Sequence, residues 1–142
     1  RLGDGSRVHV AVSPVALDSP VITIRKFPKN PITLEDLLEK ESFNEEIAQF
    51  LKMAVRARYN IFVSGATNSG KTTLLNVLSD FIPKNERIIT IEDTAELQIR
   101  NVPNLVRLEA RNSVVEGCRE ITIRDLLSAS LRMRPDRRMI IK

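Results

Sequence analysis

Apolar and polar positions alternate in two short stretches near the start of the chain. Residues 7–12 place valine at every second position, and residues 21–27 alternate isoleucine with threonine and arginine. A period of two predicts β-strands that bury one face of a sheet. The segment Leu-Gly-Asp-Gly-Ser at residues 2–6 predicts a hairpin tip before the first strand. We therefore expect residues 1–27 to be the end of a small α+β N-terminal domain.

The pattern changes after two closely spaced prolines, which predict a linker at residues 28–32. Apolar residues now recur every three or four positions, as in helices with one apolar face. Thr33 and Ser42 are each followed within three residues by an acidic residue, so both are predicted to be helix N-caps. The second helix is expected to end near Arg58. Its predicted apolar face consists of Ile47, Phe50, Leu51, Ala54 and Val55.

Short apolar runs alternate with helical stretches in the rest of the chain. The runs are continuous, as in strands that are buried on both faces. Strands are predicted at residues 60–64, 87–91, 105–108 and 139–141, and helices at residues 70–82 and 122–133. Thr122, with Asp125 three residues further on, is the predicted N-cap of the helix at residues 122–133. Strands that alternate with helices are typical of an α/β fold with a mostly parallel sheet.

A phosphate-binding motif lies between the first of these strands and the helix that follows. Residues 65–72, Gly-Ala-Thr-Asn-Ser-Gly-Lys-Thr, match G-x-x-x-x-G-K-[ST]. Gly65 and Gly70 allow phosphate oxygens to approach backbone N–H groups, and the helix N-terminus adds a positive field. Lys71 can reach the β- and γ-phosphates, and the Thr72 hydroxyl can bind Mg²⁺. The expected nucleotide-binding residues are Gly65, Ala66, Thr67, Asn68, Ser69, Gly70, Lys71, Thr72 and Thr73.

The strand–loop–helix context argues against a chance match to this motif. The motif alone does not distinguish ATP from GTP. The chain contains no Asn-Lys-x-Asp sequence, the pattern that reads guanine, so ATP is the expected nucleotide.

Three carboxylates follow the second predicted strand. Glu92, Asp93 and Glu96 stand at its carboxyl end, where ligands gather in open α/β sheets. Glu92 or Asp93 could hold a Mg²⁺-bound water or orient the water that attacks the γ-phosphate. Glu96 could pair with a nearby arginine. The alternative is a solvated acidic turn with no chemical role.

Composition narrows the possible classes of protein. Apolar residues make up 42% of the chain and charged residues 28%, as in ordinary globular proteins. No apolar run reaches the roughly 20 residues that cross a bilayer. A single cysteine, Cys118, suits a reducing compartment such as the cytoplasm, and a single histidine, His9, excludes a multi-histidine metal site within the chain. The scattered net charge of +4, one tyrosine and no tryptophan argue against a nucleic-acid partner.

Five segments resemble, in the same order, those of the type II/type IV secretion ATPases, and most closely those of the tight-adherence (Flp) pilus assembly ATPases. They are Leu-Gly-Asp-Gly-Ser-Arg-Val at residues 2–8, Thr-Ile-Arg-Lys-Phe at residues 23–27, the phosphate-loop region at residues 64–76, Ile-Thr-Ile-Glu-Asp-Thr-Ala-Glu-Leu at residues 89–97 and Leu-Arg-Met-Arg-Pro-Asp-Arg at residues 131–137. The resemblance implies that residues 33–142 form the first part of a RecA-like P-loop NTPase core. It further implies a hexameric motor that uses ATP and Mg²⁺ at the cytoplasmic face of the inner membrane. Such a motor acts with a secretion or pilus platform protein in that membrane and drives pilin assembly or protein export.

The resemblance also assigns roles to particular residues. Glu92 matches the acid of the family's aspartate box, which helps to position Mg²⁺ or water. Arg7 and Arg25 match arginines that the N-terminal domain contributes towards the γ-phosphate. Together with Lys71 these residues are the expected catalytic set, and Thr72 and Glu92 are the expected metal ligands.

The end of the chain departs from the family pattern. After Arg-Pro-Asp-Arg the family has a short strand that ends in Gly-Glu, which carries the Walker B acid, and then a histidine box. Here Ile141 and Lys142 stand at the Gly-Glu position. The chain begins without methionine and stops at Lys142 inside a predicted strand, so we expect a piece of a longer ATPase that is incomplete at its C-terminus. This piece is expected to bind nucleotide poorly and to hydrolyse it slowly or not at all.

Two other functions stay open from the sequence. A RecA-like core could drive nucleic-acid transfer, or the chain could be a non-hydrolysing module that docks onto partner subunits.

Overall fold

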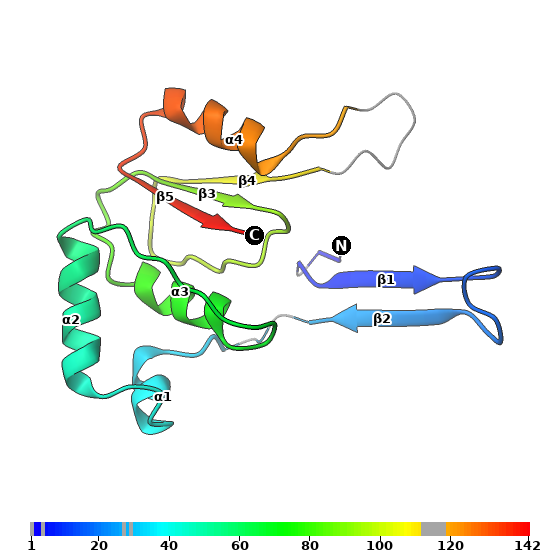
Figure 1. Cartoon of the computed structure of the whole chain (residues 1–142), viewed down its shortest axis with the longest axis horizontal. Helices are drawn as coiled ribbons and strands as arrows, with labels where there is room; N and C mark the ends of the chain where they lie inside the picture. The colour runs from blue at the N-terminus through cyan, green and yellow to red at the C-terminus, as the bar shows by residue number, and fades with distance from the viewer. Residues whose placement is uncertain (1, 4, 27, 29, 112–118) are drawn as a thin grey trace. The chain divides into compact units, whose positions relative to one another are not determined.

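The computed structural model describes residues 2–3, 5–26, 28, 30–111 and 119–142 (Figure 1). The chain divides into two compact units, Arg1–Pro31 and Ile32–Lys142, which are described separately. Cys118 lies outside the described residues, as do Asp4 of the predicted hairpin tip and Phe27 at the end of the second predicted strand.

The first unit is a two-stranded antiparallel ribbon of β1 (Arg7–Ala11) and β2 (Val21–Arg25). Arg7 lies opposite Arg25, and Ala11 lies opposite Val21. Both predicted strands are confirmed, but the predicted half-burial is wrong because every residue of β2 is exposed. Two strands alone form no second layer, so the isoleucine side chains of β2 have nothing within the unit to cover them.

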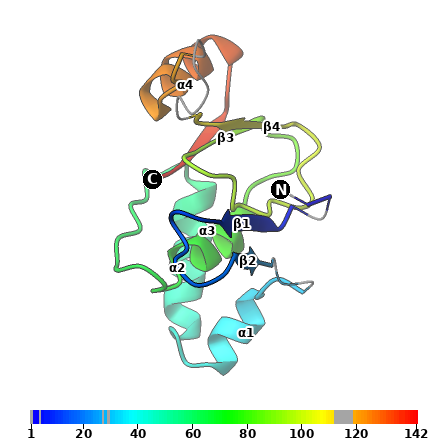
Figure 2. The same cartoon turned by 90° about the vertical axis from the view of Figure 1, so that its right-hand side faces the viewer.

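The second unit is built around a three-stranded parallel sheet with the strand order β4-β3-β5. Its strands are β3 (Ile88–Glu92), β4 (Leu105–Glu109) and β5 (Arg137–Ile141), and its helices are α1 (Leu34–Glu39), α2 (Glu45–Arg56), α3 (Lys71–Ser79) and α4 (Ile123–Ser130). Helix α4 lies on one side of the sheet, and α2 and α3 lie on the other (Figures 1 and 2). The predicted α/β class with parallel strands is confirmed for this unit.

Strand β3 is central because it can be buried on both faces. All five of its residues are buried, and its three isoleucines have no exposed surface. β-Branched side chains fit this position since they pack well on a pleated surface. On the side of α2 and α3 the core consists of Val55, Leu78, Ile82 and Ile88, with Leu51, Leu74, Leu105 and Met139 packed against them.

Local side chains fix the starts of the helices. Thr33 with Asp36, and Thr122 with Asp125, form capping boxes, as the sequence predicts at both positions. The prediction of Ser42 as a cap is wrong. The N-cap of α2 is Asn44, whose Oδ1 accepts a hydrogen bond from the backbone N–H of Ile47 at 2.9 Å. Serine and asparagine are both favoured N-caps, so the acidic residue three positions after Ser42 does not by itself make Ser42 the cap.

Helix α2 turns only part of its predicted apolar face to the core: Ala54 and Val55 are buried and Leu51 packs against the core, as predicted. Ala48 is also buried, whereas Ile47 is 46% exposed and Phe50 is 64% exposed. The two exposed residues were predicted to be core. A helix with apolar residues over more than half its circumference does not reveal from its own sequence which part will be covered.

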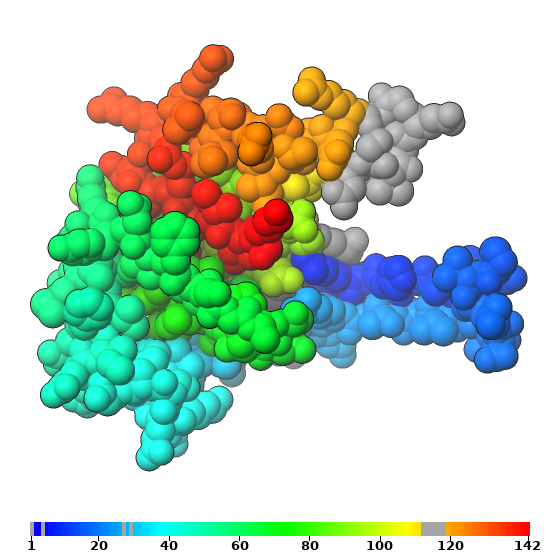
Figure 3. Space-filling model, viewed as in Figure 1, coloured from blue at the N-terminus to red at the C-terminus, as the bar shows by residue number. Residues whose placement is uncertain are grey.

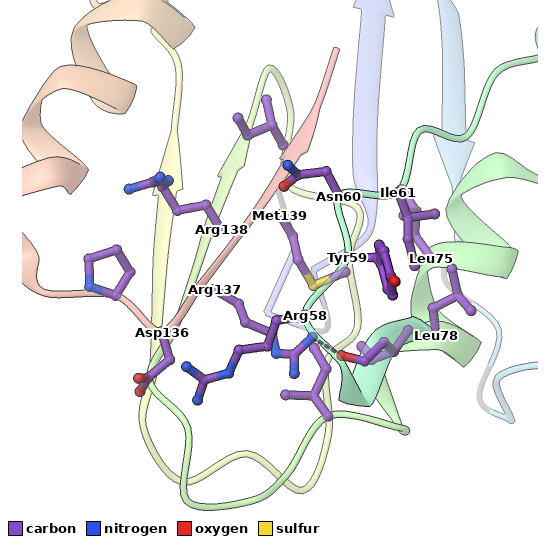
Figure 4. Close-up of a pocket in the computed structure, with 15 residues that line it drawn as sticks. Arg58, Tyr59, Asn60, Ile61, Leu75, Leu78, Asp136, Arg137, Arg138 and Met139 are labelled. Atoms are coloured by element: carbon purple, nitrogen blue, oxygen red, sulfur yellow. Dashed lines mark hydrogen bonds between the residues drawn. The ribbon is translucent and has the colours of Figure 1, made fainter. Parts of the chain in front are cut away.

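The strand predicted at residues 60–64 is absent from the structure. Ile61 and Val63 are half-buried, but Phe62 is 95% exposed, and none of the strands in the described chain pairs with this segment. A cavity of 290 Å³ lies between residues 58–61, α3 and β5 (Figure 4). The segment therefore borders this cavity instead of pairing with β5, as paired strands lie only about 4.8 Å apart.

Candidate functional site

The predicted phosphate loop runs directly into the N-terminus of α3. Gly70 is the N-cap and has φ 89°, a left-handed conformation that favours glycine. A Cβ atom on Gly65 would stand 2.5 Å from Oγ and 3.3 Å from Cβ of Ser69, so a side chain at this position would displace the Ser69 side chain. Gly70 therefore has a conformational reason, and Gly65 has a steric one that depends on where the Ser69 side chain lies. Residues 65–70 are exposed, and the segment that contains them lies on the visible surface, in green in Figure 3.

Lys71 points back into this loop. Its Nζ donates hydrogen bonds to the carbonyl oxygens of Gly65 at 2.9 Å and Ala66 at 2.7 Å. The cap Gly70 has no side chain to accept from the first turn, and that turn carries no acidic residue. The ammonium group and the positive end of the helix thus act at the same place, as an anion site requires.

The Thr72 side chain connects the loop to the acidic segment after β3. Its Oγ1 donates a hydrogen bond to Oε2 of Glu96 at 3.4 Å. The hydroxyl group predicted to bind Mg²⁺ therefore has a carboxylate beside it. Mg²⁺ suits such a pair, because this cation takes oxygen ligands and is usually held by one or two carboxylates together with phosphates.

Four consecutive backbone N–H groups hold the acidic segment in place by donating to side chains. Ala95 donates to Glu109 Oε1 at 3.1 Å, and Glu96 and Leu97 donate to Glu92 Oε2 at 2.6 and 2.8 Å. Gln98 donates to Asn76 Oδ1 at 2.9 Å. The side chains that accept these four hydrogen bonds lie on β3, β4 and α3, so three elements of the core shape this one segment.

Glu92 itself is wholly buried. Its Oε2 accepts the two backbone bonds, whereas its Oε1 accepts no hydrogen bond and lies 3.9 Å from Nη2 of Arg107. The same Nη2 atom donates to the carbonyl oxygen of Leu97 at 3.0 Å. Arg107 thus partly balances a buried negative charge and holds the far end of the same segment.

The remaining predicted site residues lie apart from this cluster or in the other unit. Asp93 is exposed, and its backbone N–H donates to the carbonyl oxygen of Ile141 at 3.2 Å. Arg7 and Arg25 face each other across the ribbon of the first unit, where His9 is exposed. The roles expected of these residues towards a nucleotide stay predictions.

Sequence reasoning missed Asn76 and Glu109. Asn76 follows Thr72 by one helical turn, so the two share a face of α3. Glu109 ends β4 directly beside Glu92 in the register of the sheet. Helical spacing could have indicated Asn76, but the position of Glu109 depends on the pairing of two strands that are distant in sequence.

A second polar cluster lies where β3 and β5 begin, at the end of the sheet opposite to the acidic segment. Arg137, the last residue of the Arg-Pro-Asp-Arg segment, is labelled in Figure 4. It donates through Nη1 to the carbonyl oxygen of Val55 at the end of α2 and through Nε to Glu86. Arg58 Nη2 also donates to Glu86 at 3.1 Å, and Asp136 accepts from the backbone N–H of Arg87 at 2.7 Å. The hydrogen bond from Arg137 is the main reason that the pKa of Glu86 lies below its usual value.

Metal binding by protein side chains alone has no support in the described chain. Nowhere among these residues do three His, Cys, Asp or Glu side chains gather closely enough to hold an ion. None of the described helices combines the length and the apolarity needed to span a membrane.

Known proteins resemble this chain over nearly its whole length. An uncharacterized protein of Methanocaldococcus jannaschii is 47% identical over 143 residues, which cover 96% of this chain and 20% of that protein. Type IV secretion system protein VirB11 of Bartonella quintana is 34% identical over 170 residues, which cover 96% of this chain and 47% of that protein. This chain thus spans less than half the length of either relative.

A solved structure and a family profile agree with these relatives. The crystal structure of the VirB11 ATPase from the Brucella suis type IV secretion system, in complex with sulphate, superposes with a TM-score of 0.58 at 31% identity. The match covers 98% of this chain and 46% of that one. The profile of the Type II/IV secretion system protein family matches residues 1–141. The chain therefore belongs to the Type II/IV secretion system protein family.

Proposed function

We propose that the second unit binds ATP through residues 65–73 and forms part of a motor ATPase. The observation that carries this proposal is the position of Lys71, whose ammonium group lies inside a glycine loop at the uncapped end of α3. The ATPase relatives in the family support the choice of nucleotide. In this proposal the unit is the first part of a RecA-like core, and residues 1–27 end an N-terminal domain joined by a linker at residues 28–32.

The loop and helix bind the phosphates in this proposal. Backbone N–H groups of the loop and of the first turn of α3 donate to phosphate oxygens. Lys71 exchanges its two carbonyl partners for the β- and γ-phosphates, since charged oxygens accept stronger hydrogen bonds than carbonyls do. Thr72 and a carboxylate of the segment 92–96 hold Mg²⁺. When bound, this cation neutralises charge that develops on the β- and γ-phosphates.

Residues outside the second unit complete the proposed motor. Arg7 and Arg25 belong to its catalytic set, as the family pattern implies. The whole protein assembles as a homo-oligomer, a hexamer in the family's pattern, at the cytoplasmic side of the cell membrane. There it couples ATP hydrolysis to protein export or pilin assembly through a platform protein in the membrane.

Thermal unfolding with ATP and MgCl₂ tests the binding step. A ligand at 100 times its dissociation constant stabilises the native state by about 2.7 kcal/mol, so the melting temperature of the wild-type chain should rise by several degrees. Lys71→Ala should lose most of this rise. Lys84→Ala, which removes an exposed lysine outside the loop, should keep it. Equal shifts in wild type and Lys71→Ala would refute the proposed site.

A phosphate-release assay tests the chemical step separately. We expect little turnover from this chain, because Ile141 and Lys142 stand where the family carries its Gly-Glu pair. Turnover above that of Lys71→Ala would show that this acid is dispensable. Nucleotide binding without turnover agrees with the proposal, whereas the absence of both would favour a docking module.

A further inference from the structure

One face of the ribbon in the first unit is apolar. Val8 lies opposite Ile24, and Val10 lies opposite Ile22. Side chains that are directly opposite in an antiparallel pair point to the same face, and every second residue of a strand shares that face. The four side chains therefore form one surface, and all four are exposed.

The loop that joins β1 to β2 extends this apolar surface (Figure 1). Val15 is 82% exposed and Leu17 is 92% exposed. Asp18 is the only charged residue between His9 and Arg25. A single exposed apolar side chain needs no explanation, but a contiguous group of them marks a surface that something else covers.

Positive charge gathers at the other end of the ribbon. Arg7 lies opposite Arg25 where β1 begins and β2 ends, and Lys26 follows as an exposed residue. Residues 1–31 contain five arginines and lysines, two aspartates and no glutamate, which gives a net charge of +3. The other residues contain 17 basic and 16 acidic side chains, a net charge of +1. The first unit thus carries most of the excess positive charge of the chain.

We propose that this ribbon docks on a bilayer that contains anionic phospholipid, with its apolar face and loop in the interfacial region and its basic end among the headgroups. An element that combines an apolar surface with nearby cations binds such membranes because apolar burial and attraction to the headgroups act together. The inference goes beyond the proposed function, since it does not require a nucleotide at the phosphate loop.

The arrangement of these residues favours a bilayer over a protein partner. They occupy a face of the ribbon and also the loop beyond it, so a protein would need a groove that encloses both, whereas lipid chains adapt to any shape. A second copy of the chain would bring two units of net charge +3 together, which repulsion opposes. Insertion stays shallow because the outer edges of a two-stranded ribbon carry backbone groups that need water or headgroups as partners.

Cosedimentation with vesicles measures the docking. The full chain should sediment with vesicles of equal parts phosphatidylglycerol and phosphatidylcholine, and should bind pure phosphatidylcholine at least about tenfold more weakly. Leu17→Ser should weaken binding to the anionic vesicles by at least about tenfold, because it removes apolar surface from the loop. Lys26→Gln should weaken it about fivefold, since each cation near an anionic surface contributes separately.

Leu131→Ser is the matched control, because Leu131 is an exposed leucine of the second unit. It should leave vesicle binding unchanged, and Leu17→Ser should melt at the wild-type temperature because its side chain is exposed. A fluorophore on Leu17→Cys, in a Cys118→Ser background, gives a second readout. Its emission should shift to the blue with anionic vesicles, whereas the same fluorophore on Lys84→Cys, at an exposed position of the second unit, should not respond.

Three other results would overturn the proposal. Wild type that stays in the supernatant with anionic vesicles would exclude membrane docking. Equal binding of wild type and Leu17→Ser would place the membrane contact elsewhere in the chain. A dimer that forms without vesicles and that Leu17→Ser disperses would identify a second copy as the occupant. Thermal shifts with ATP, measured on Leu17→Ser and Lys26→Gln, should match those of wild type, so a failure of vesicle docking and a failure of nucleotide binding are separate results.

Discussion

Arg137 donates hydrogen bonds to both carboxylate oxygens of Glu86, through Nε and Nη2. The pair joins the first residue of β5 to the turn that precedes β3. Its side chains are only 12% and 6% exposed, and the same guanidinium donates to the end of α2 at Val55. One arginine thus connects three elements of the second unit, and its effect on stability should exceed that of an exposed ion pair.

Arg137→Lys should lower the free energy of unfolding by about 2 kcal/mol, because an ammonium group cannot bond both oxygens of Glu86 and the carbonyl of Val55 together. Urea denaturation measures this change. Arg138→Lys is the matched control, since its side chain is on the exposed position of the same strand. Equal losses in the two variants would show that the Glu86 pair contributes no more than a surface charge.

Stability should also depend on pH through Glu86. Hydrogen bonds from Arg137 hold its pKa below the usual range despite partial burial, and Arg58 acts in the same direction. A carboxyl group whose folded pKa is depressed adds stability above its unfolded pKa and loses it as pH falls through the folded pKa. The free energy of unfolding should therefore decrease as the pH is lowered below about 4.

Denaturation of wild type and Glu86→Gln between pH 7 and pH 3 checks this dependence. The wild type should be the more stable protein at pH 7, and the difference should shrink steadily in acid. Asp36 and Asp125 also have lowered pKa values from their capping threonines, so both proteins keep some acid sensitivity. If the difference in unfolding free energy between wild type and Glu86→Gln stays constant from pH 7 to pH 3, Glu86 is excluded as a source of the acid sensitivity.

The two loop glycines should respond differently to alanine. Gly65→Ala places a methyl group 2.5 Å from Ser69 Oγ, so the Ser69 side chain has to turn away from its present place in the loop. Its affinity for a fluorescent ATP analogue should drop at least about tenfold, the effect of some 1.4 kcal/mol. Adding Ser69→Ala should restore part of the loss because it removes the clashing oxygen. Gly70→Ala meets no atom within 4 Å but forces alanine into φ 89°, so Ser69→Ala should not rescue it.

The elements that sequence predicted correctly are those specified by nearby residues. The threonine caps of α1 and α4 and the glycine loop before α3 depend on contacts within a few positions. Strands β3, β4 and β5 were predicted because their apolar residues are continuous or nearly so.

The errors concern partners that lie far away in sequence. Residues 60–64 are as apolar as β3 but pair with no strand in the described chain. The isoleucines of β2 alternate correctly but have no layer to cover them. The different surroundings of Glu92 and Glu96 depend on Arg107 and Asn76, which no local spacing connects to them. Sequence indicated that the acidic segment matters but not which carboxylate faces the loop.

Asn76→Ala should loosen the acidic segment without disturbing the phosphate loop. The variant removes the oxygen that accepts from the Gln98 N–H, one of the four bonds that fix residues 95–98. Hydrogen exchange of peptides that cover these residues should therefore speed up, while peptides from β3 keep their protection because that strand is wholly buried. Nucleotide binding in EDTA should match that of wild type. The Mg²⁺ concentration that gives half of the Mg²⁺-dependent increase in binding should rise, because Glu96 would no longer be held beside Thr72. Asn85→Ala, at an exposed position, should leave both readings unchanged. Unaltered exchange at residues 95–98 in Asn76→Ala would mean that the Glu92 and Glu109 bonds alone hold the segment.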